Sequence, residues 1–293
     1  MSIIEKFWLF LAEKDFFMKV KSVNLKEEYA VKGGVLDCIT MDYPFDREDM
    51  AWKRPAVIVI PGGGYAMCSK REGDPIAIEF LARGFQVFVL WYLNSLDGVA
   101  YPEQLTEIAC AVDYVRKHAA EFSVNPDEVF PVGFSAGGHL TASLATLYGE
   151  VEEITGLKLD CKPTATGLCY PVIYESGHMG SFINLTQGYA EEDAAKLKKS
   201  LSLHERVTAD TPPAFIFSST EDVTVPPKNA LLYAMAMAEN GIPFELHVYP
   251  KGKHGLANCN MEISADYGDA IVQSRAWLDS CAAFFRQFTV EKF

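Results

Sequence analysis

A serine that could act as a nucleophile lies at the centre of a glycine-rich motif. The run is Gly133-Phe134-Ser135-Ala136-Gly137-Gly138-His139. Glycines on both sides allow the serine to occupy a sharp, strained turn between a strand and a helix. An apolar run at residues 128–132 precedes the motif, and a segment rich in alanine and leucine at 140–148 follows it. The motif therefore predicts a strand, a nucleophile elbow and a helix, in that order.

The serine needs two partners, because its hydroxyl is a poor nucleophile at neutral pH. A base must take its proton, and an acid must orient that base. Asp222 and His254 each follow a predicted strand closely, further along the chain. We therefore predict Ser135 as the nucleophile, His254 as the base and Asp222 as the acid, with Glu221 as the alternative acid. Since a protonated imidazole cannot accept the serine proton, we expect activity to fall at acidic pH.

Backbone N–H groups are needed where the attacked carbonyl oxygen becomes negatively charged. Removing one such donor raises the barrier by about 3 to 4 kcal/mol in comparable enzymes. Gly62-Gly63-Gly64 follows an early predicted strand, and Ala136 follows the serine. We predict Gly63, Gly64 and Ala136 as the donors. A phosphate-binding turn is the weaker alternative, because the glycines lack a following Gly-Lys-Ser/Thr and the dinucleotide fingerprint.

The other histidines suit structural positions better than catalysis. His139 lies one helical turn after the serine and predicts a packed residue, His247 alternates within a strand, and His118 and His204 indicate surface helices. His178 alone could reach the site, from an insertion. His, Cys and Asp residues show no metal-ligand spacing, so we predict neither a metal nor a cofactor.

Strands and helices alternate along most of the chain. We predict a hairpin from strands 21–29 and 35–43, followed by strands 56–60, 85–92, 128–132, 164–172, 214–218 and 244–249. Of these we expect 56–60, 164–172, 214–218 and 244–249 to be buried. The predicted helices are 75–83, 102–121, 140–148, 228–240 and 274–288. This order predicts a mostly parallel sheet with helices on both faces and an antiparallel hairpin leading in. The chain order of serine, acid and histidine is the one expected for the α/β-hydrolase fold.

Two segments depart from this alternation. Residues 173–210 predict a cap-like insertion over the serine that shapes substrate access. Residues 1–20 predict an amphipathic helical extension that packs on the domain, with a dimer contact or an interfacial site as alternatives. Charges interrupt this segment too often for a signal peptide or a membrane anchor. We expect one domain over residues 1–293.

Composition narrows the class of partner. The net charge of -13 argues against nucleic acid and anionic membrane surfaces, and it says little about a neutral substrate. The predicted catalytic residues, rather than the charge, indicate a small-molecule ester as the partner. The 7 cysteines form no close pair, which favours reduced, mostly buried thiols in a cytoplasmic protein. A homo-oligomer stays open.

Several motifs together resemble the acetyl esterase and acetylxylan esterase branch of the α/β-hydrolases. They lie at residues 61–65, 69–75, 133–140, 178–182, 210–213, 222–226 and 252–256. The resemblance covers the chain from about Val35. Related hydrolases often have histidine before the three glycines, where this chain has Pro61, and many carry Asn-Tyr-Arg where this chain has Leu90-Trp91-Tyr92-Leu93.

The resemblance implies hydrolysis of short acyl esters, often acetyl groups on sugars, through a covalent acyl-enzyme. Ser135, His254 and Asp222 would then be nucleophile, base and orienting acid. Tyr65, Trp91 and Tyr92 are candidates for a pocket wall, and His178 for a substrate contact. Two other functions stay open: an amidase similar to kynurenine formamidases, and a ligand-binding protein without turnover.

Overall fold

An eight-stranded sheet organises the part of the chain that the structure describes, residues 18–41, 53–260 and 274–290 of this computed structural model. The strands are β1 (Met18–Asn24), β2 (Val35–Met41), β3 (Arg54–Ile60), β4 (Gln86–Trp91), β5 (Val124–Phe134), β6 (Thr166–Cys169), β7 (Ala214–Ser219) and β8 (Phe244–Tyr249). Their order is β1-β2-β4-β3-β5-β6-β7-β8. The pairs β1–β2 and β2–β4 are antiparallel, and the others are parallel. The predicted α/β-hydrolase architecture is confirmed.

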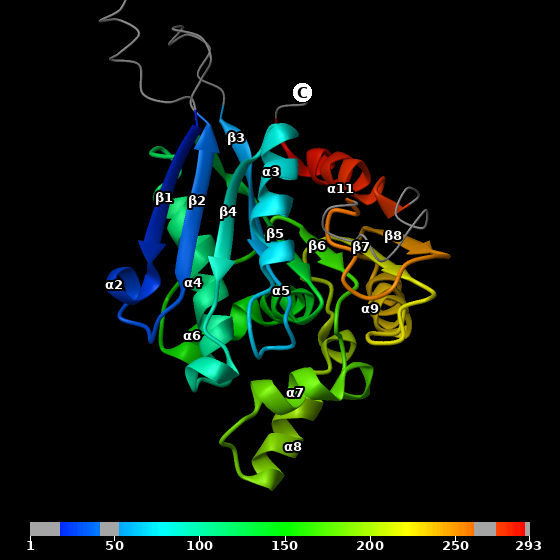
Figure 1. Cartoon of the computed structure of the whole chain (residues 1–293). Helices are drawn as coiled ribbons and strands as arrows, with labels where there is room; N and C mark the ends of the chain where they lie inside the picture. Colours follow the sequence, from blue (N-terminus) through cyan, green and yellow to red (C-terminus); the bar gives the residue numbers. More distant parts are fainter. Residues whose placement is uncertain (1–17, 42–52, 261–273, 291–293) are drawn as a thin grey trace, which may run out of the picture.

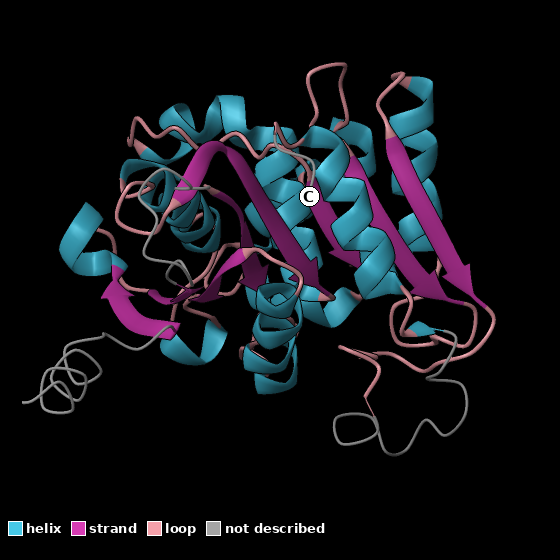
Figure 2. Cartoon of the chain, turned by 90° about the horizontal axis from the view of Figure 1, so that it is seen from above, coloured by secondary structure: helices cyan, strands magenta, loops and turns pink. Residues whose placement is uncertain are grey.

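Helices cover the sheet on both faces (Figure 2). They are α2 (Leu25–Tyr29), α3 (Asp74–Ala82), α4 (Glu103–Lys117), α5 (Ala136–Leu147), α6 (Val151–Thr155), α7 (Met179–Leu185), α8 (Glu191–Ser200), α9 (Lys228–Glu239) and α11 (Trp277–Phe285). Figure 1 shows α3 in front of the sheet and α4 behind it.

The two faces follow from the two-residue period of the strands. In β3, Ala56, Ile58 and Ile60 pack against apolar side chains of α4 and α5. Val57 and Val59 point to the other face, where they join residues of α3 and α11. Because both faces are covered, the strand is a continuous apolar run. Each such side chain contributes about 1.5 to 3 kcal/mol by its burial.

The strand order brings two loops together at the centre of the sheet. The chain passes from β3 to β4 on one side and then returns to form β5 on the other side of β3. Ile60 and Gly133 are partners in the parallel register, so the glycine loop after β3 and the elbow after β5 leave the sheet side by side. Parallel sheets bind ligands at such a switch point, beyond the carboxyl ends of the strands.

The predicted insertion forms α7 and α8, and it contacts the glycine loop. Figure 1 shows both helices at the end of the molecule toward which β4 points. The side-chain amide of Asn184 in α7 donates to the carbonyl oxygen of Gly64 at 2.9 Å. The ring of Phe182 packs edge-on against His139, one turn into α5. The insertion therefore lies against the loops that follow β3 and β5.

The first predicted hairpin strand is wrong over its second half. Residues 25–29 form the short helix α2 rather than a continuation of β1. Asn24 caps this helix, because its side-chain oxygen accepts from the N–H of Lys26 at 3.1 Å, and Leu25 is buried beneath it. The antiparallel pairing of β1 with β2 is confirmed, whereas residues 42 and 43 lie outside the described residues.

Other predicted boundaries also change. β8 is an edge strand with partly exposed side chains, so its prediction as a buried strand is wrong. β5 begins earlier than predicted, at Val124, and its pairing with β3 is irregular between Val124 and Val129. Residues 1–17 of the predicted helical extension lie outside the described residues, and 18–20 belong to β1. One domain over 1–293 stays a prediction. No helix within the described ranges is both long enough and apolar enough to cross a bilayer.

Candidate active site

Ser135 occupies a strained turn between β5 and α5. Its backbone angles are φ 52 and ψ -115, a combination that side-chain-bearing residues rarely adopt and that costs of the order of 1 to 3 kcal/mol. The flanking glycines allow it by close packing. A Cβ atom on Gly133 would lie 2.1 Å from the carbonyl oxygen of Gly137, and one on Gly137 would lie 2.2 Å from that of Ile60. The predicted nucleophile elbow is present.

A chain of hydrogen bonds joins the serine to a histidine and a carboxylate. The Oγ atom of Ser135 lies 2.8 Å from Nε2 of His254, and Nδ1 of His254 lies 2.7 Å from Oδ2 of Asp222. A carboxylate only accepts, so Nδ1 carries the proton and Nε2 is left to accept from the serine hydroxyl. This is the arrangement in which an imidazole acts as a general base.

The structure distinguishes between the two neighbouring carboxylates. The side chain of Asp222 is fully buried, and its Oδ1 atom accepts the N–H groups of Thr224 and Val225 at 3.0 and 2.8 Å. Glu221 instead points to the surface, where it pairs with Lys251 at 2.5 Å, and this ion pair lowers the pKa of its carboxyl group. Of the two acids, Asp222 is therefore the one that contacts His254, and its role as the orienting acid stays a prediction.

The three predicted donors lie in the glycine loop after β3 and at the start of α5, and within the described residues none of them has an acceptor. Gly63 and Gly64 have positive φ angles of 125 and 64, which turn the glycine loop sharply after β3. Ala136 is the first residue of α5, so its N–H group has no partner within the helix. Gly62 differs, because its N–H group donates to Glu72 at 2.9 Å. The role of the three donors stays a prediction.

His178 lies near the glycine loop, at the start of α7. Its Nδ1 atom accepts the backbone N–H group of Ser181 at 3.2 Å, so the proton of the neutral ring must lie on Nε2. Burial lowers its pKa, and the positive charge of protonated His254 lowers it further. The ring therefore offers one Nε2–H donor, for which no acceptor is recorded among the described residues.

Two of the three aromatic residues predicted as a pocket wall are core residues. Tyr65 and Tyr92 are 1% and 2% exposed. The Tyr65 hydroxyl lies 2.9 Å from Nδ1 of His139, and the Tyr92 hydroxyl donates to the carbonyl oxygen of Pro61 at 2.9 Å. Their prediction as a wall is wrong, because both side chains are buried in the core and their hydroxyl groups bind other residues of the protein. Trp91 donates to Asp37 at 2.7 Å, and its substrate contact stays a prediction.

Comparison with known proteins relates the chain to known families. Residues 45–166 match the BD-FAE family, and residues 164–282 match the prolyl oligopeptidase family. MGS-M1, an alpha/beta hydrolase enzyme from a deep-sea metagenome library of the Medee basin, has 28% sequence identity and a TM-score of 0.72 over 93% of this chain and 99% of its own. This chain has the α/β-hydrolase fold.

Other relatives of this α/β-hydrolase have names that refer to xylan. Endo-1,4-beta-xylanase B of Butyrivibrio fibrisolvens is 36% identical over 72% of this chain and 34% of its own length. An acetylxylan esterase of Xylanibacter ruminicola is 31% identical over 78% and 46%. This hydrolase thus spans less than half the length of these curated relatives. The solved acetyl ester-xyloside bifunctional hydrolase of Caldicellulosiruptor lactoaceticus is 28% identical, with a TM-score of 0.77 over 94% of this chain and 98% of its own.

Glu72 is a residue near the glycine loop for which no local sequence pattern predicts a role. It ends the short helix η2 (Lys70–Glu72), and its side chain is buried. Its two oxygens accept from the N–H group of Gly62 and from the hydroxyl of Tyr170, at 2.9 and 2.8 Å. Burial raises its pKa. The stretch 69–75 had contributed to the family resemblance, which was the only sequence signal for it.

The remaining histidines do not join the hydrogen-bond chain of the hydrolase. His139 is buried, and its Nε2 atom donates to the carbonyl oxygen of Leu201 at 3.0 Å, while burial lowers its pKa to about 4. Its prediction as a structural residue is confirmed. His, Cys, Asp and Glu side chains form no metal-binding group within 18–41, 53–260 and 274–290. All 7 cysteines lie in these ranges and are unpaired, and all except Cys68 are buried.

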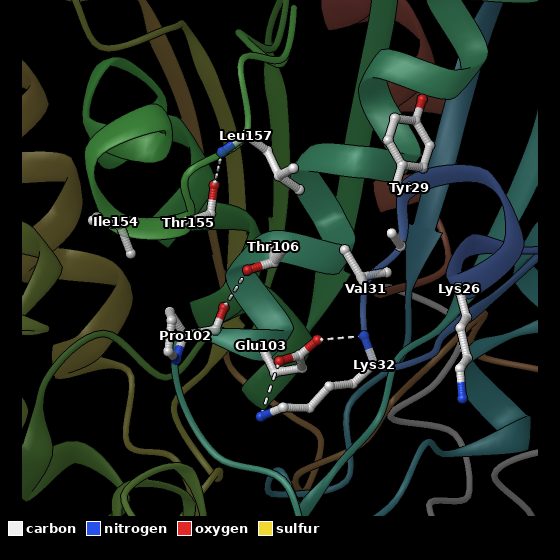
Figure 3. A pocket seen from close by; sticks show the side chains of 11 residues that line it. Lys26, Tyr29, Val31, Lys32, Pro102, Glu103, Thr106, Ile154, Thr155 and Leu157 are labelled. Carbon is white, nitrogen blue, oxygen red and sulfur yellow. Dashed lines mark hydrogen bonds and ion pairs between the residues drawn. The ribbon is translucent and has the colours of Figure 1, made fainter.

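A cavity of about 550 Å³ lies away from the candidate site (Figure 3). It is lined by residues of α2, the start of α4 and the end of α6. Two of its lining residues, Lys32 and Glu103, contact each other. The backbone N–H group of Lys32 donates to the Glu103 carboxylate at 3.0 Å, and the Lys32 ammonium group pairs with the same carboxylate at 3.2 Å. None of the predicted site residues lines this cavity, so we assign it no part in the chemistry.

Proposed function

We propose that this α/β-hydrolase is a serine esterase that removes short acyl groups, acetyl above all, from sugars. The observation that carries the proposal is the continuous hydrogen-bond chain from Ser135 through His254 to Asp222. Its serine lies at the start of α5, and the glycine loop with two of the proposed backbone N–H donors leaves the sheet from the neighbouring strand β3. A nucleophile, its base and donors for a developing negative charge are the parts that acyl transfer requires.

The geometry supports a two-step reaction. In the first step His254 takes the proton from Ser135 as Oγ attacks the ester carbonyl, and then gives that proton to the departing alcohol. An acyl group remains on Oγ. In the second step His254 takes a proton from water as the water oxygen attacks the acyl carbonyl, and then returns that proton to Oγ of Ser135 as the acid leaves. Asp222 keeps the imidazole in the required tautomer and stabilises its positive charge.

Donors near the serine would stabilise both tetrahedral intermediates. We propose Gly63, Gly64 and Ala136 for this role, because the glycine loop and the start of α5 leave the sheet beside each other. The N-terminus of α5 adds a partial positive charge at the same place. Such donors act without reorganisation, and losing one slows comparable enzymes by about 100- to 1,000-fold.

The preference for a sugar ester rests on two observations. The relatives include an acetylxylan esterase and a hydrolase described as acting on acetyl esters and xylosides. His178 offers a neutral Nε2–H donor near the glycine loop, and its Nδ1 atom is held by Ser181. We propose that this donor binds a hydroxyl group on the alcohol side of the ester. Acetylated xylo-oligosaccharides are then the expected substrate class.

The test compares the hydrolysis of ester bonds with that of a formamide bond by the same protein. Purified protein is given p-nitrophenyl acetate, acetylated xylo-oligosaccharides and N-formylkynurenine, with Ser135→Ala as the control. The proposal expects turnover of both acetyl esters and none by the variant. Turnover of the formamide alone would show an amidase, and no turnover of any substrate would show a binding protein. The cytoplasmic location and the homo-oligomer stay predictions.

A further inference from the structure

The helix η2 connects two loops that carry parts of the candidate site. The glycine loop at residues 61–64 follows β3, and the histidine loop at residues 252–257 follows β8. These loops are far apart in the sequence. Arg71 and Glu72, adjacent in η2, each form hydrogen bonds to groups outside the helix.

Glu72 holds the backbone of the glycine loop in place by a hydrogen bond. Its Oε2 atom accepts the N–H group of Gly62 at 2.9 Å, and the carbonyl oxygen of Gly62 accepts the N–H group of Ser69 at 2.9 Å. Both polar groups of the Gly62 backbone are therefore held by residues in or next to η2. Gly63 and Gly64, the proposed donors, follow immediately. The direction in which their N–H groups point depends on the orientation of the preceding peptide group.

The second oxygen of Glu72 reaches the histidine loop through Tyr170. Oε1 accepts the Tyr170 hydroxyl at 2.8 Å, and the same hydroxyl oxygen accepts the N–H group of Ala257 at 2.9 Å. The Tyr170 ring packs edge-on against the His254 ring, with 5.2 Å between the ring centres. The Arg71 guanidinium donates to the carbonyl oxygen of Gly255 at 2.5 Å.

The electrostatic surroundings of the Glu72 carboxyl group agree with the hydrogen bonds that it accepts. Glu72 is 4% exposed, and both of its oxygens accept from a donor. Burial raises the pKa of its carboxyl group, whereas the bonds from Tyr170 and Gly62 and the positive charges of His254 and Arg71 lower it. A carboxylate in this place is complementary to the imidazolium that forms on His254 during the proposed reaction.

We propose that Glu72 and Tyr170 are positioning residues that hold the oxyanion donors and His254 in one fixed geometry around Ser135. The inference rests on the proposed serine hydrolase function, and adds to it how two separate loops keep their relative position. Small displacements of reacting groups cost large factors in rate. Loosening this connection should therefore slow the chemical step more than it weakens substrate binding.

Two conservative variants break the connection at different points. In Glu72→Gln, the amide has one acceptor oxygen for two donors, so either Gly62 or Tyr170 loses its acceptor. Tyr170→Phe keeps the ring against His254 but removes the bonds to Glu72 and Ala257. Glu107→Gln is the matched control, because Glu107 is another buried glutamate that accepts one backbone N–H group, from Leu93 at 2.7 Å.

The readouts are kcat and KM for p-nitrophenyl acetate, the rate at which a fluorophosphonate labels Ser135, and the melting temperature. We expect Glu72→Gln to lower kcat by about 10- to 100-fold, with KM within about threefold of the original and labelling slowed in parallel. Tyr170→Phe should lower kcat by about three- to tenfold. The kcat of the double variant should lie within about threefold of that of Glu72→Gln, since both residues act through one network. Glu107→Gln should keep kcat within about twofold.

The inference is wrong if folded Glu72→Gln keeps kcat within about twofold, or if its KM rises as much as its kcat falls. If Glu72→Gln does not fold, Tyr170→Phe decides in the same way. Wild-type protein that neither turns over the ester nor reacts with the fluorophosphonate would overturn the proposed function, and this inference with it. An active wild type with equally active variants would overturn the inference alone.

Discussion

The Nδ1 atom of His254 lies 2.7 Å from Oδ2 of Asp222, although the two residues are 32 positions apart on loops after β8 and β7. The adjacent carboxylate, Glu221, points to the surface and pairs with Lys251. The structure thus gives a matched pair of neighbouring acids, one that contacts His254 and one that does not.

Changing each acid to its amide separates their roles. We expect Asp222→Asn to lower kcat for p-nitrophenyl acetate by about 10,000-fold, because an amide can donate to Nδ1 and so favours the wrong imidazole tautomer. Glu221→Gln should keep kcat within about threefold. The reverse pattern, or equal effects of the two changes, would contradict the assignment of Asp222.

The role of His178 can be tested without disturbing α7. Asparagine is a good helix N-cap, so His178→Asn keeps an acceptor for the N–H group of Ser181 and removes the Nε2–H donor. We expect kcat/KM for acetylated xylo-oligosaccharides to fall by about tenfold, and that for p-nitrophenyl acetate to change by less than about threefold. Equal losses on both substrates would show that the residue does not distinguish the alcohol.

The buried carboxyl group of Glu107 should lower the free energy of unfolding as the pH rises. Burial raises the pKa of its carboxyl group from 4.5 to about 8. Between these values the folded protein binds the proton more tightly than the unfolded chain does, so this group costs stability as the pH rises. At pH 7 the cost reaches about 3 kcal/mol as an upper bound.

The variant Glu107→Gln removes this cost while keeping the acceptor for the N–H group of Leu93. Its free energy of unfolding in urea should exceed that of the original protein at pH 7 to 8, and the difference should shrink toward pH 4.5. A difference that is constant over this range, or a destabilised variant at pH 8, would show that the carboxyl group is not the cause.

Much of the site could be predicted because each reactive residue follows a strand directly. The glycines around Ser135 indicate the elbow, and Asp222 and His254 come after apolar runs whose carboxyl ends meet at one edge of a parallel sheet. Chain order and local pattern are enough for such residues. The sheet with its two helical faces was predictable for the same reason, since the alternation of apolar runs and amphipathic segments is local.

The missing parts depend on contacts that no local pattern shows. Glu72 and Tyr170 are 98 positions apart, and their bond exists only after β3 and β6 are in place. Tyr65 and Tyr92 looked like pocket walls because they are aromatic and lie in stretches where the chain is compared with its relatives, yet their hydroxyl groups bind His139 and Pro61 in the core. The exposure of β8 follows from its place at the edge of the sheet, which apolar content does not determine.

The most direct test of the proposed function is to trap the acyl-enzyme. Protein mixed with p-nitrophenyl acetate is quenched in acid during turnover, digested and analysed by mass spectrometry. We expect one acetyl group on the peptide that contains Ser135, and none in Ser135→Ala, which should also have lost turnover by at least about 1,000-fold. Turnover that survives in Ser135→Ala, or acetyl transfer to another residue during turnover, would contradict the account.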